Sequence, residues 1–320
     1  MKQPFAPMDL SGLKTYPLSE RNSKVSANDF ARPWKTSGSF ADFLTTLPNI
    51  LAAGDVRAVV SALADAHLAN RTIMLGMGAH VIKVGLSPLI INLMERGIIS
   101  AVAMNGAGII HDLEIAMTGK TSEDVAAALG DGSFGMAKET GVFLGEAIEQ
   151  AGKSNKGLGR TIGEAIEHAE LPVRENSILA AGARLGVPVT VHVAIGTDII
   201  HMHPAYDPAA CGYASHLDFR IFSSVVSTLE GGGYLNLGSA VILPEVFLKA
   251  ITLVRNLGHT PEKFTTVNMD FIRHYRPMTN VVCRPTSGGG RGFNLVGHHE
   301  VMFPLIAAAL IERIEQLKNA

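Results

Sequence analysis

Three polar side chains of this sequence, His80, His111 and Asp198, are well suited to proton chemistry. Each comes shortly after a short apolar run that is typical of a buried strand. Histidine titrates near neutral pH, and a carboxylate close to a pocket rim can exchange a proton with a bound molecule. These three residues are therefore the candidate catalytic acids and bases.

His201 and His203 suggest an alternative chemistry, because two histidines two positions apart share one face of a strand and can bind one metal ion. Together with His111 and with Asp112 or Asp198, they would form the centre of a metal-dependent hydrolase or lyase. On a loop the same spacing carries little information, so this alternative depends on the local structure.

Glycine-rich segments follow several of the same apolar runs and predict close approach of the backbone to a ligand. They are Gly76–His80, Asn105–Gly108 and Gly238–Ala240. The first lacks the full dinucleotide fingerprint, since the third glycine would fall at Val81. Arg284–Gly292 combines glycines with two arginines and could cradle a phosphate or carboxylate, or form a mobile surface loop.

The last helix is opened by the adjacent pair His298 and His299. Neighbouring residues on a helix point to different sides, so the pair is a poor bidentate metal site.

Apolar runs of four to eight residues alternate with helical patterns, which predicts an α/β fold with a Rossmann-like parallel sheet covered by helices on both faces. Ligands of such sheets bind beyond the carboxyl ends of the strands. Residues 1–38 are rich in Pro, Ser, Lys and Asn and predict an irregular arm, and residues 39–320 predict a single domain. The expected strands are 72–76, 98–104, 187–195, 234–237 and 265–269, and the expected helices 88–96, 121–129, 177–185, 244–257 and 300–317.

Composition narrows the function classes. The formal net charge of −2 argues against a nucleic-acid partner, which usually demands a basic excess. No apolar run is long enough to cross a membrane, and the first residues lack the apolar core of a signal peptide. Two cysteines are too few for a disulfide framework, so we expect a cytoplasmic protein that acts on a small molecule.

The order and contents of these segments resemble the deoxyhypusine synthase family, whose members use NAD to transfer an aminobutyl group from spermidine to a protein lysine. The likeness covers roughly residues 40–315. It implies the family's transferase fold, NAD as cofactor, and a homotetramer with sites at subunit interfaces. The family patterns "GxTSNxxSSG", "TAGGxEED", "NSI…PVFxPALTDGSLGDMIxFH", "LGGGVVKHH" and "VFPL" resemble residues 76–85, 105–112, 176–203, 237–245 and 302–305.

The departures from the family concern its chemistry. No lysine occurs between Lys263 and Lys318, the region in which the family has its catalytic lysine, and Arg291 stands near that position. Arginine stays protonated and is not a nucleophile. Of the family's polyamine-binding acids, only Asp198 is clearly kept, whereas Lys83 and Arg284 introduce positive charge. A trication such as spermidine would bind poorly here, so an anionic or neutral ligand is expected.

We therefore predict a deoxyhypusine-synthase-like enzyme that binds NAD or another anionic small molecule and is not a true deoxyhypusine synthase. The alternatives are the metal-dependent enzyme described above and a non-catalytic member of the family. By resemblance, the expected cofactor-binding residues are Gly76, Gly78, Lys83, Asn105, Gly106, Ala107, Gly108, Gly238, Ser239, Arg284, Arg291 and His298.

Overall fold

The computed structural model describes residues 5–319, and its contacts divide the chain into two units that meet between Gly54 and Asp55. The sequence places the end of the arm earlier, after residue 38. In the first unit, two 3-10 turns, η1 (Leu18–Glu20) and η2 (Ala27–Asp29), are followed by helix α1 (Phe40–Thr46).

Local contacts explain why α1 groups with the residues before it. Ser39 and Asp42 form a reciprocal capping box at the start of the helix. The ring of Trp34 packs edge-on against Phe43 at a centroid distance of 5.9 Å. Between residues 5 and 50 the first unit is therefore an irregular segment with two 3-10 turns and one short, well-capped helix.

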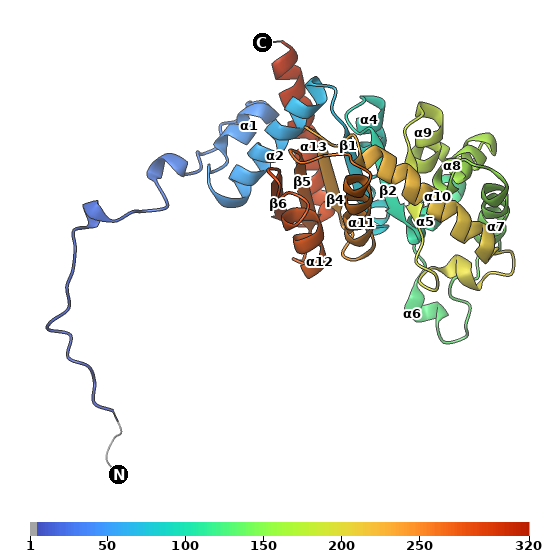
Figure 1. The fold of residues 1–320 in the computed structure, drawn as a ribbon, viewed down its shortest axis with the longest axis horizontal. Helices are drawn as coiled ribbons and strands as arrows, with labels where there is room; N and C mark the ends of the chain where they lie inside the picture. The colour runs from blue at the N-terminus through green and yellow to red at the C-terminus, as the bar shows by residue number, and fades with distance from the viewer. Residues whose placement is uncertain (1–4, 320) are drawn as a thin grey trace. The chain divides into compact units, whose positions relative to one another are not determined.

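The second unit is an α/β fold built on a six-stranded sheet (Figure 1). Every pair of neighbouring strands is parallel, and the strand order is β3-β2-β1-β4-β5-β6. This confirms the predicted Rossmann-like sheet. The strands are β1 (Ile73–Met77), β2 (Ala101–Asn105), β3 (Val189–His192), β4 (Gly233–Leu237), β5 (Thr265–Asp270) and β6 (Arg291–Val296).

Helices connect successive strands and cover the sheet, as parallel strands require. Several begin at recognisable caps, such as the Ser177 hydroxyl at α9 and the Asp207 carboxylate at α10. The helices are α2 (Leu51–Leu68), α3 (His80–Lys83), α4 (Ser87–Glu95), α5 (Gly106–Thr118), α6 (Val125–Ala128), α7 (Lys138–Lys153), α8 (Leu158–His168), α9 (Ile178–Leu185), α10 (Pro208–Val226), α11 (Ile242–Asn256), α12 (Tyr275–Pro277) and α13 (His299–Lys318).

Helices α10 and α11 lie on one face of the sheet (Figure 1), and an aromatic core joins them to it. Tyr234 of β4 stacks on Phe247 of α11 at 3.9 Å, and Phe222 of α10 packs edge-on against Tyr234. Each of these rings is fully buried, which contributes about 1.5–3 kcal/mol per side chain. This core fixes the strand β4 and helix α11, which flank the candidate site.

The sequence missed one strand and misjudged one loop. Residues 284–292 were expected to be a loop, and their last two residues instead begin β6. The strand is hard to recognise because Arg291 and Gly292 open it and only Phe293 and Leu295 are buried. A π-helical turn, η5 (Met278–Cys283), lies in the crossover before it.

The helices of residues 5–319 include none that is both long and apolar enough to cross a membrane.

Candidate functional site

The carboxyl ends of β1 and β4 mark the point at which the strand order reverses, since β1 leads outward to β2 and β4 to β5. The turns after these two strands touch. The Gly78 N–H donates to the Leu237 carbonyl at 2.9 Å, and a Cβ on Gly78 would lie 2.2 Å from the Gly238 carbonyl oxygen. Only glycine fits at residue 78, and backbone lines the crevice where sheets of this kind bind ligands.

On the β2 and β3 side of this point lies a cavity of about 210 Å³. Helices α3 and α5 and two connecting segments build its walls. Among the predicted residues it brings together Lys83, Ala107, His111 and Asp198. The other lining residues are Ile110, Glu114, Ser122, Glu123, Val125, Phe134, Thr197 and Ile199.

Asp198 approaches the first turn of α5. A Cβ on Gly106 would lie 2.1 Å from Asp198 Oδ2, so glycine is needed for this approach. The oxygen is buried and has no hydrogen-bond partner among residues 5–319. Burial raises the pKa of the Asp198 carboxyl, opposed by the nearby His201. A buried carboxylate oxygen without a donor is costly, which marks Asp198 Oδ2 as an atom suited to meet a ligand.

His111 belongs to a hydrogen-bonded chain on the same wall. Its Nδ1 lies 2.7 Å from the Thr121 hydroxyl, which donates to Glu114 Oε2 at 2.5 Å. Burial, and secondarily the charge of Lys83, lower the pKa of His111 to about 4. His111 is therefore neutral at neutral pH and is oriented by Thr121.

The charge balance of the cavity differs from the expected anion site. Three of its lining side chains are carboxylates, from Glu114, Glu123 and Asp198, against one cation, Lys83. Glu123 accepts a hydrogen bond from the Gly135 N–H at 2.9 Å, which holds it in place. A neutral or amine-bearing ligand group therefore suits this cavity better than an anionic one.

On the β5 and β6 side, the carboxyl edge carries a cluster of rings and one buried carboxylate. His80 lies edge-on to His299 at a centroid distance of 5.8 Å. Phe271 stacks in parallel with His298 at 6.0 Å and meets His299 at 5.8 Å. Asp270, the last residue of β5, lies beside them, with Oδ1 at 3.8 Å from His299 Nε2.

Sequence reasoning singled out His80 and His298 here, named His299 only as half of a poor metal site, and missed Asp270 and Phe271. The signal was available, because Asp270 directly follows the predicted strand 265–269. The expectation that the adjacent histidines point apart is confirmed, since His299 is 2% exposed and the His298 side chain 73%.

The predicted arginines lie away from this edge. Arg291 begins β6 opposite Thr265, the first residue of β5, so it lies at the amino end of the sheet. Its guanidinium stacks on Phe293 at 5.0 Å. Arg284 lies in the crossover after η5 and donates to Asn280 Oδ1 at 2.9 Å. The expected cofactor-binding residues Arg291 and His298 therefore do not line one pocket, because the length of β6 separates them.

Gly76 and Ser239 have packing roles. A Cβ on Gly76 would lie 2.2 Å from the Tyr234 hydroxyl, so this glycine makes room for the aromatic core. The Ser239 hydroxyl accepts a hydrogen bond from the Leu243 N–H at 3.1 Å and thereby caps α11.

The residues of the alternative metal centre have other partners. Asp112 accepts hydrogen bonds from the Ser177 hydroxyl and from the Ile178 and Leu179 N–H groups, so it caps α9. His201 Nδ1 accepts from the Asp198 N–H, and the His203 ring packs against Gly141. Within residues 5–319, no three His, Cys, Asp or Glu side chains converge as metal ligands. These residues are therefore not gathered into one metal site in the described part of the chain.

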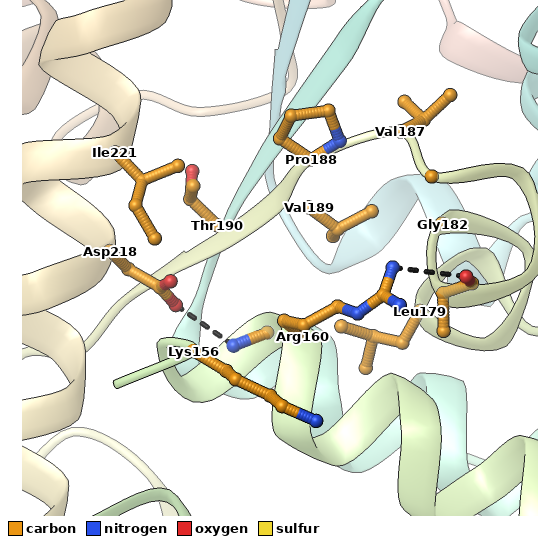
Figure 2. A pocket seen from close by; sticks show the side chains of 13 residues that line it. Lys156, Arg160, Leu179, Gly182, Val187, Pro188, Val189, Thr190, Asp218 and Ile221 are labelled. Atoms are coloured by element: carbon orange, nitrogen blue, oxygen red, sulfur yellow. Dashed lines mark hydrogen bonds between the residues drawn. The ribbon is translucent and has the colours of Figure 1, made fainter. Parts of the chain in front are cut away.

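A second cavity, of about 180 Å³, lies at the amino end of β3, away from these clusters (Figure 2). Arg160 donates to the Ala183 carbonyl, and Asp218 accepts from the Gly159 N–H at 2.9 Å. The Val191 N–H also donates to Asp218, at 2.8 Å. The cavity's polar groups thus hold α8 and β3 together.

No family model matches this chain, and no curated protein sequence matches it. Solved structures resemble it in fold. A deoxyhypusine synthase-like protein from Entamoeba histolytica matches with a TM-score of 0.52 and 12% identity, over 88% of this chain and 96% of that one. A LOR/SDH-like protein from Methanococcus maripaludis S2 matches with a TM-score of 0.50 and 18% identity, over 97% and 76%.

The ternary complex of AgrE with ornithine and NAD⁺ also matches, with a TM-score of 0.52 and 14% identity over 83% of this chain. The match covers 33% of AgrE, so the present chain spans about a third of that protein's length. At these identities the likeness establishes the fold, which is deoxyhypusine-synthase-like.

The carboxyl edge has features that fit a dinucleotide. Asn105 ends β2, and its buried Oδ1 has no hydrogen-bond partner in the described part of the chain, so it could accept a bond from a ribose hydroxyl. Helix α5 begins at Gly106 without a side-chain cap, which leaves its first N–H groups for a polar ligand. The turns at Gly78 and Gly238 carry no side chain that would block the crevice.

Proposed function

We propose that this chain is an enzyme of the deoxyhypusine synthase family that binds NAD at the carboxyl edge of its sheet and has a chemistry other than deoxyhypusine synthesis. The observation that carries the proposal is the pair of buried, unpartnered oxygens, Asn105 Oδ1 and Asp198 Oδ2, beside the uncapped start of α5. Buried polar atoms without partners are rare in native proteins and are expected where a ligand completes the bonding.

In this proposal Asn105, Gly78 and Gly238 hold the cofactor by backbone and amide contacts. Bound NAD would supply a hydride acceptor. Lys83 is exposed at the rim of the cavity and would attract the negative phosphates. AgrE, which resembles this chain in fold, forms a complex that contains NAD⁺, and this supports the choice of NAD as the cofactor.

The substrate is then a small polar molecule held in the cavity beside α5. Asp198 and Glu123 would bind an amino or hydroxyl group, and neutral His111 would accept a hydrogen bond from it. Without a lysine in the region between Lys263 and Lys318, no covalent imine of the family's kind forms there.

Titration of the purified protein with NAD tests the cofactor assignment. We expect saturable binding by calorimetry, and Asn105→Ala should weaken the affinity about tenfold, or about 1.4 kcal/mol. Asn256→Ala, at the exposed end of α11, is the matched control and should leave the affinity unchanged. Absence of binding at millimolar NAD would reject the cofactor and favour a non-catalytic member of the family.

By the same resemblance we expect a homotetramer and a cytoplasmic location. Light scattering measures the first directly, and a monomer would argue against sites shared between subunits. Fractionation of cells that produce the protein measures the second.

A further inference from the structure

Asp270 is a buried carboxylate with few partners. Its side chain is 5% exposed, and its Oδ1 accepts a hydrogen bond from the N–H of the next residue, Phe271, at 2.8 Å. The nearest basic groups are His299 Nε2 at 3.8 Å and His274 Nε2 at 4.0 Å. A buried negative charge is costly unless a cation balances it. In the described residues that balance comes from groups that carry a charge only after taking up a proton.

His299 is equally short of partners. Neither ring nitrogen forms a hydrogen bond of ordinary geometry with any residue from 5 to 319. A Cβ on Gly238 would lie 2.7 Å from the ring, so the turn after β4 closes over His299. Burial lowers the pKa of His299; Asp270, Glu300 and the Met269 carbonyl raise it, and His80 lowers it. The groups facing this ring therefore come from α3, β5 and α13.

His80 connects this buried pair to the surface. It is exposed at the start of α3, with its ring edge-on to His299, and Phe271 lies 6.4 Å away. The same short helix ends at Lys83, which lines the cavity beside α5. A ligand that lies along the carboxyl edge would thus pass His80 before it reaches the cavity.

We propose that His80 accepts a proton from the bound ligand, and that His299 and Asp270 are positioning residues that orient its ring and stabilise the resulting positive charge. This assignment rests on the proposed function, because it uses the same ligand site. In the step, an O–H or N–H bond of the ligand breaks, an N–H bond forms on the His80 imidazole, and the ligand keeps the electron pair. The negative Asp270 then balances the imidazolium through His299, which follows the logic of other oriented histidine bases.

The first experiment measures the coupling without any ligand. Histidine ring carbons labelled with ¹³C are titrated by NMR in the wild type and in Asp270→Asn, His80→Gln and His259→Gln. Loss of the Asp270 charge should lower the pKa of His299 measurably, and loss of His80 should raise it. His259→Gln, in an exposed residue just after α11, should change nothing. A His299 titration that is identical in all variants would overturn the proposal.

The second experiment measures the reactivity of His80 with diethyl pyrocarbonate, which acylates imidazole, by mass spectrometry over a pH series. His299→Gln and Asp270→Asn should slow acylation of His80 threefold or more and leave the rate at His259 unchanged. Restoration of the rate in Asp270→Glu would separate the carboxylate's charge from a structural role. Equal rates in all variants would refute the chain from His80 to Asp270.

The outcomes separate the two proposals. If NAD binds but His80 reacts equally in every variant, the cofactor assignment stands and the proton chain fails. If NAD fails to bind while the variants slow His80, the chain stands and the cofactor assignment fails.

Discussion

The two halves of the carboxyl edge each contain a buried aspartate, and the two aspartates differ in how many hydrogen bonds they accept. On the β2 side, Asp112 is fully buried and accepts bonds from one hydroxyl and two backbone N–H groups at the start of α9. On the β5 side, Asp270 is nearly as buried but accepts one bond from its own neighbour and faces two histidines at about 4 Å. A carboxylate with its bonds completed is structural, whereas one left short of donors is available for proton exchange.

The largest effect expected from this comparison is on stability. Asp112→Ala leaves two backbone N–H groups of α9 buried without an acceptor and should lower the free energy of unfolding by about 3 kcal/mol. Asp270→Asn should change it by less than about 1 kcal/mol, because few hydrogen bonds depend on that carboxylate. Urea unfolding at pH 7 measures both. Equal losses would remove the distinction between the two aspartates.

Acid should reveal the cost of burying histidine on the β3 side. Burial lowers the pKa of His192 to about 3, below the unfolded value of 6.5. Because the unfolded chain binds the proton at a higher pH than the folded chain, the free energy of unfolding is unaffected by His192 above pH 6.5. It decreases as the pH drops below that value. At pH 5 the burial of His192 should have lowered the free energy of unfolding by about 2 kcal/mol.

His192→Gln should remove that part of the pH dependence, measured as the change in unfolding free energy between pH 7 and pH 5. His216→Gln, exposed on α10, is the control and should retain it. The aspartates Asp112 and Asp218, whose pKa values burial raises to about 6 and about 7, act in the opposite sense in all variants. A wild-type slope in His192→Gln would contradict this account.

Replacing a glycine on each half of the carboxyl edge, Gly238 or Gly106, should lower the stability by a smaller amount. Gly238→Ala places a Cβ against His299 at a backbone φ of +64°, and should cost about 2 kcal/mol from strain and overpacking. Gly106→Ala meets the end of the Asp198 side chain, which can move, and should cost about 1 kcal/mol. Thermal unfolding ranks the two, and a larger loss in Gly106→Ala would mean that Asp198 is held rigidly.

The smallest effect on stability is expected at Asp198 itself. Because burial raises the pKa of Asp198, the ionised group is held at a cost, and Asp198→Asn should raise the melting temperature by less than about 3 °C at pH 8. Any NAD-site ligand that depends on this carboxylate should bind more weakly to the same variant. A clear loss of stability would assign Asp198 to the structural class of Asp112.

The parallel sheet could be predicted because its inner strands are continuous apolar runs with glycine and capping signals at the helix ends, as at Gly186 and Gly258. β6 could not, because an edge strand needs only one buried face and begins here with an arginine and a glycine. Within the site, His111, Asp198 and Lys83 follow their strands closely and were predicted to lie together. The role of Asp112 could not be read from sequence, because its partners at Ser177 and Ile178 lie far along the chain.

The Asp218 carboxylate has a consequence for association between molecules. β3 is the outermost strand on its side, and its free backbone edge would be a template for a strand from another chain. The Asp218 carboxylate accepts a hydrogen bond from the Val191 N–H. The Ser215 hydroxyl donates to the Val191 carbonyl and accepts from the Val193 N–H. Side chains of α10 thereby occupy the backbone N–H and carbonyl groups that an added strand would pair with. This edge of the sheet is therefore protected against strand pairing between molecules.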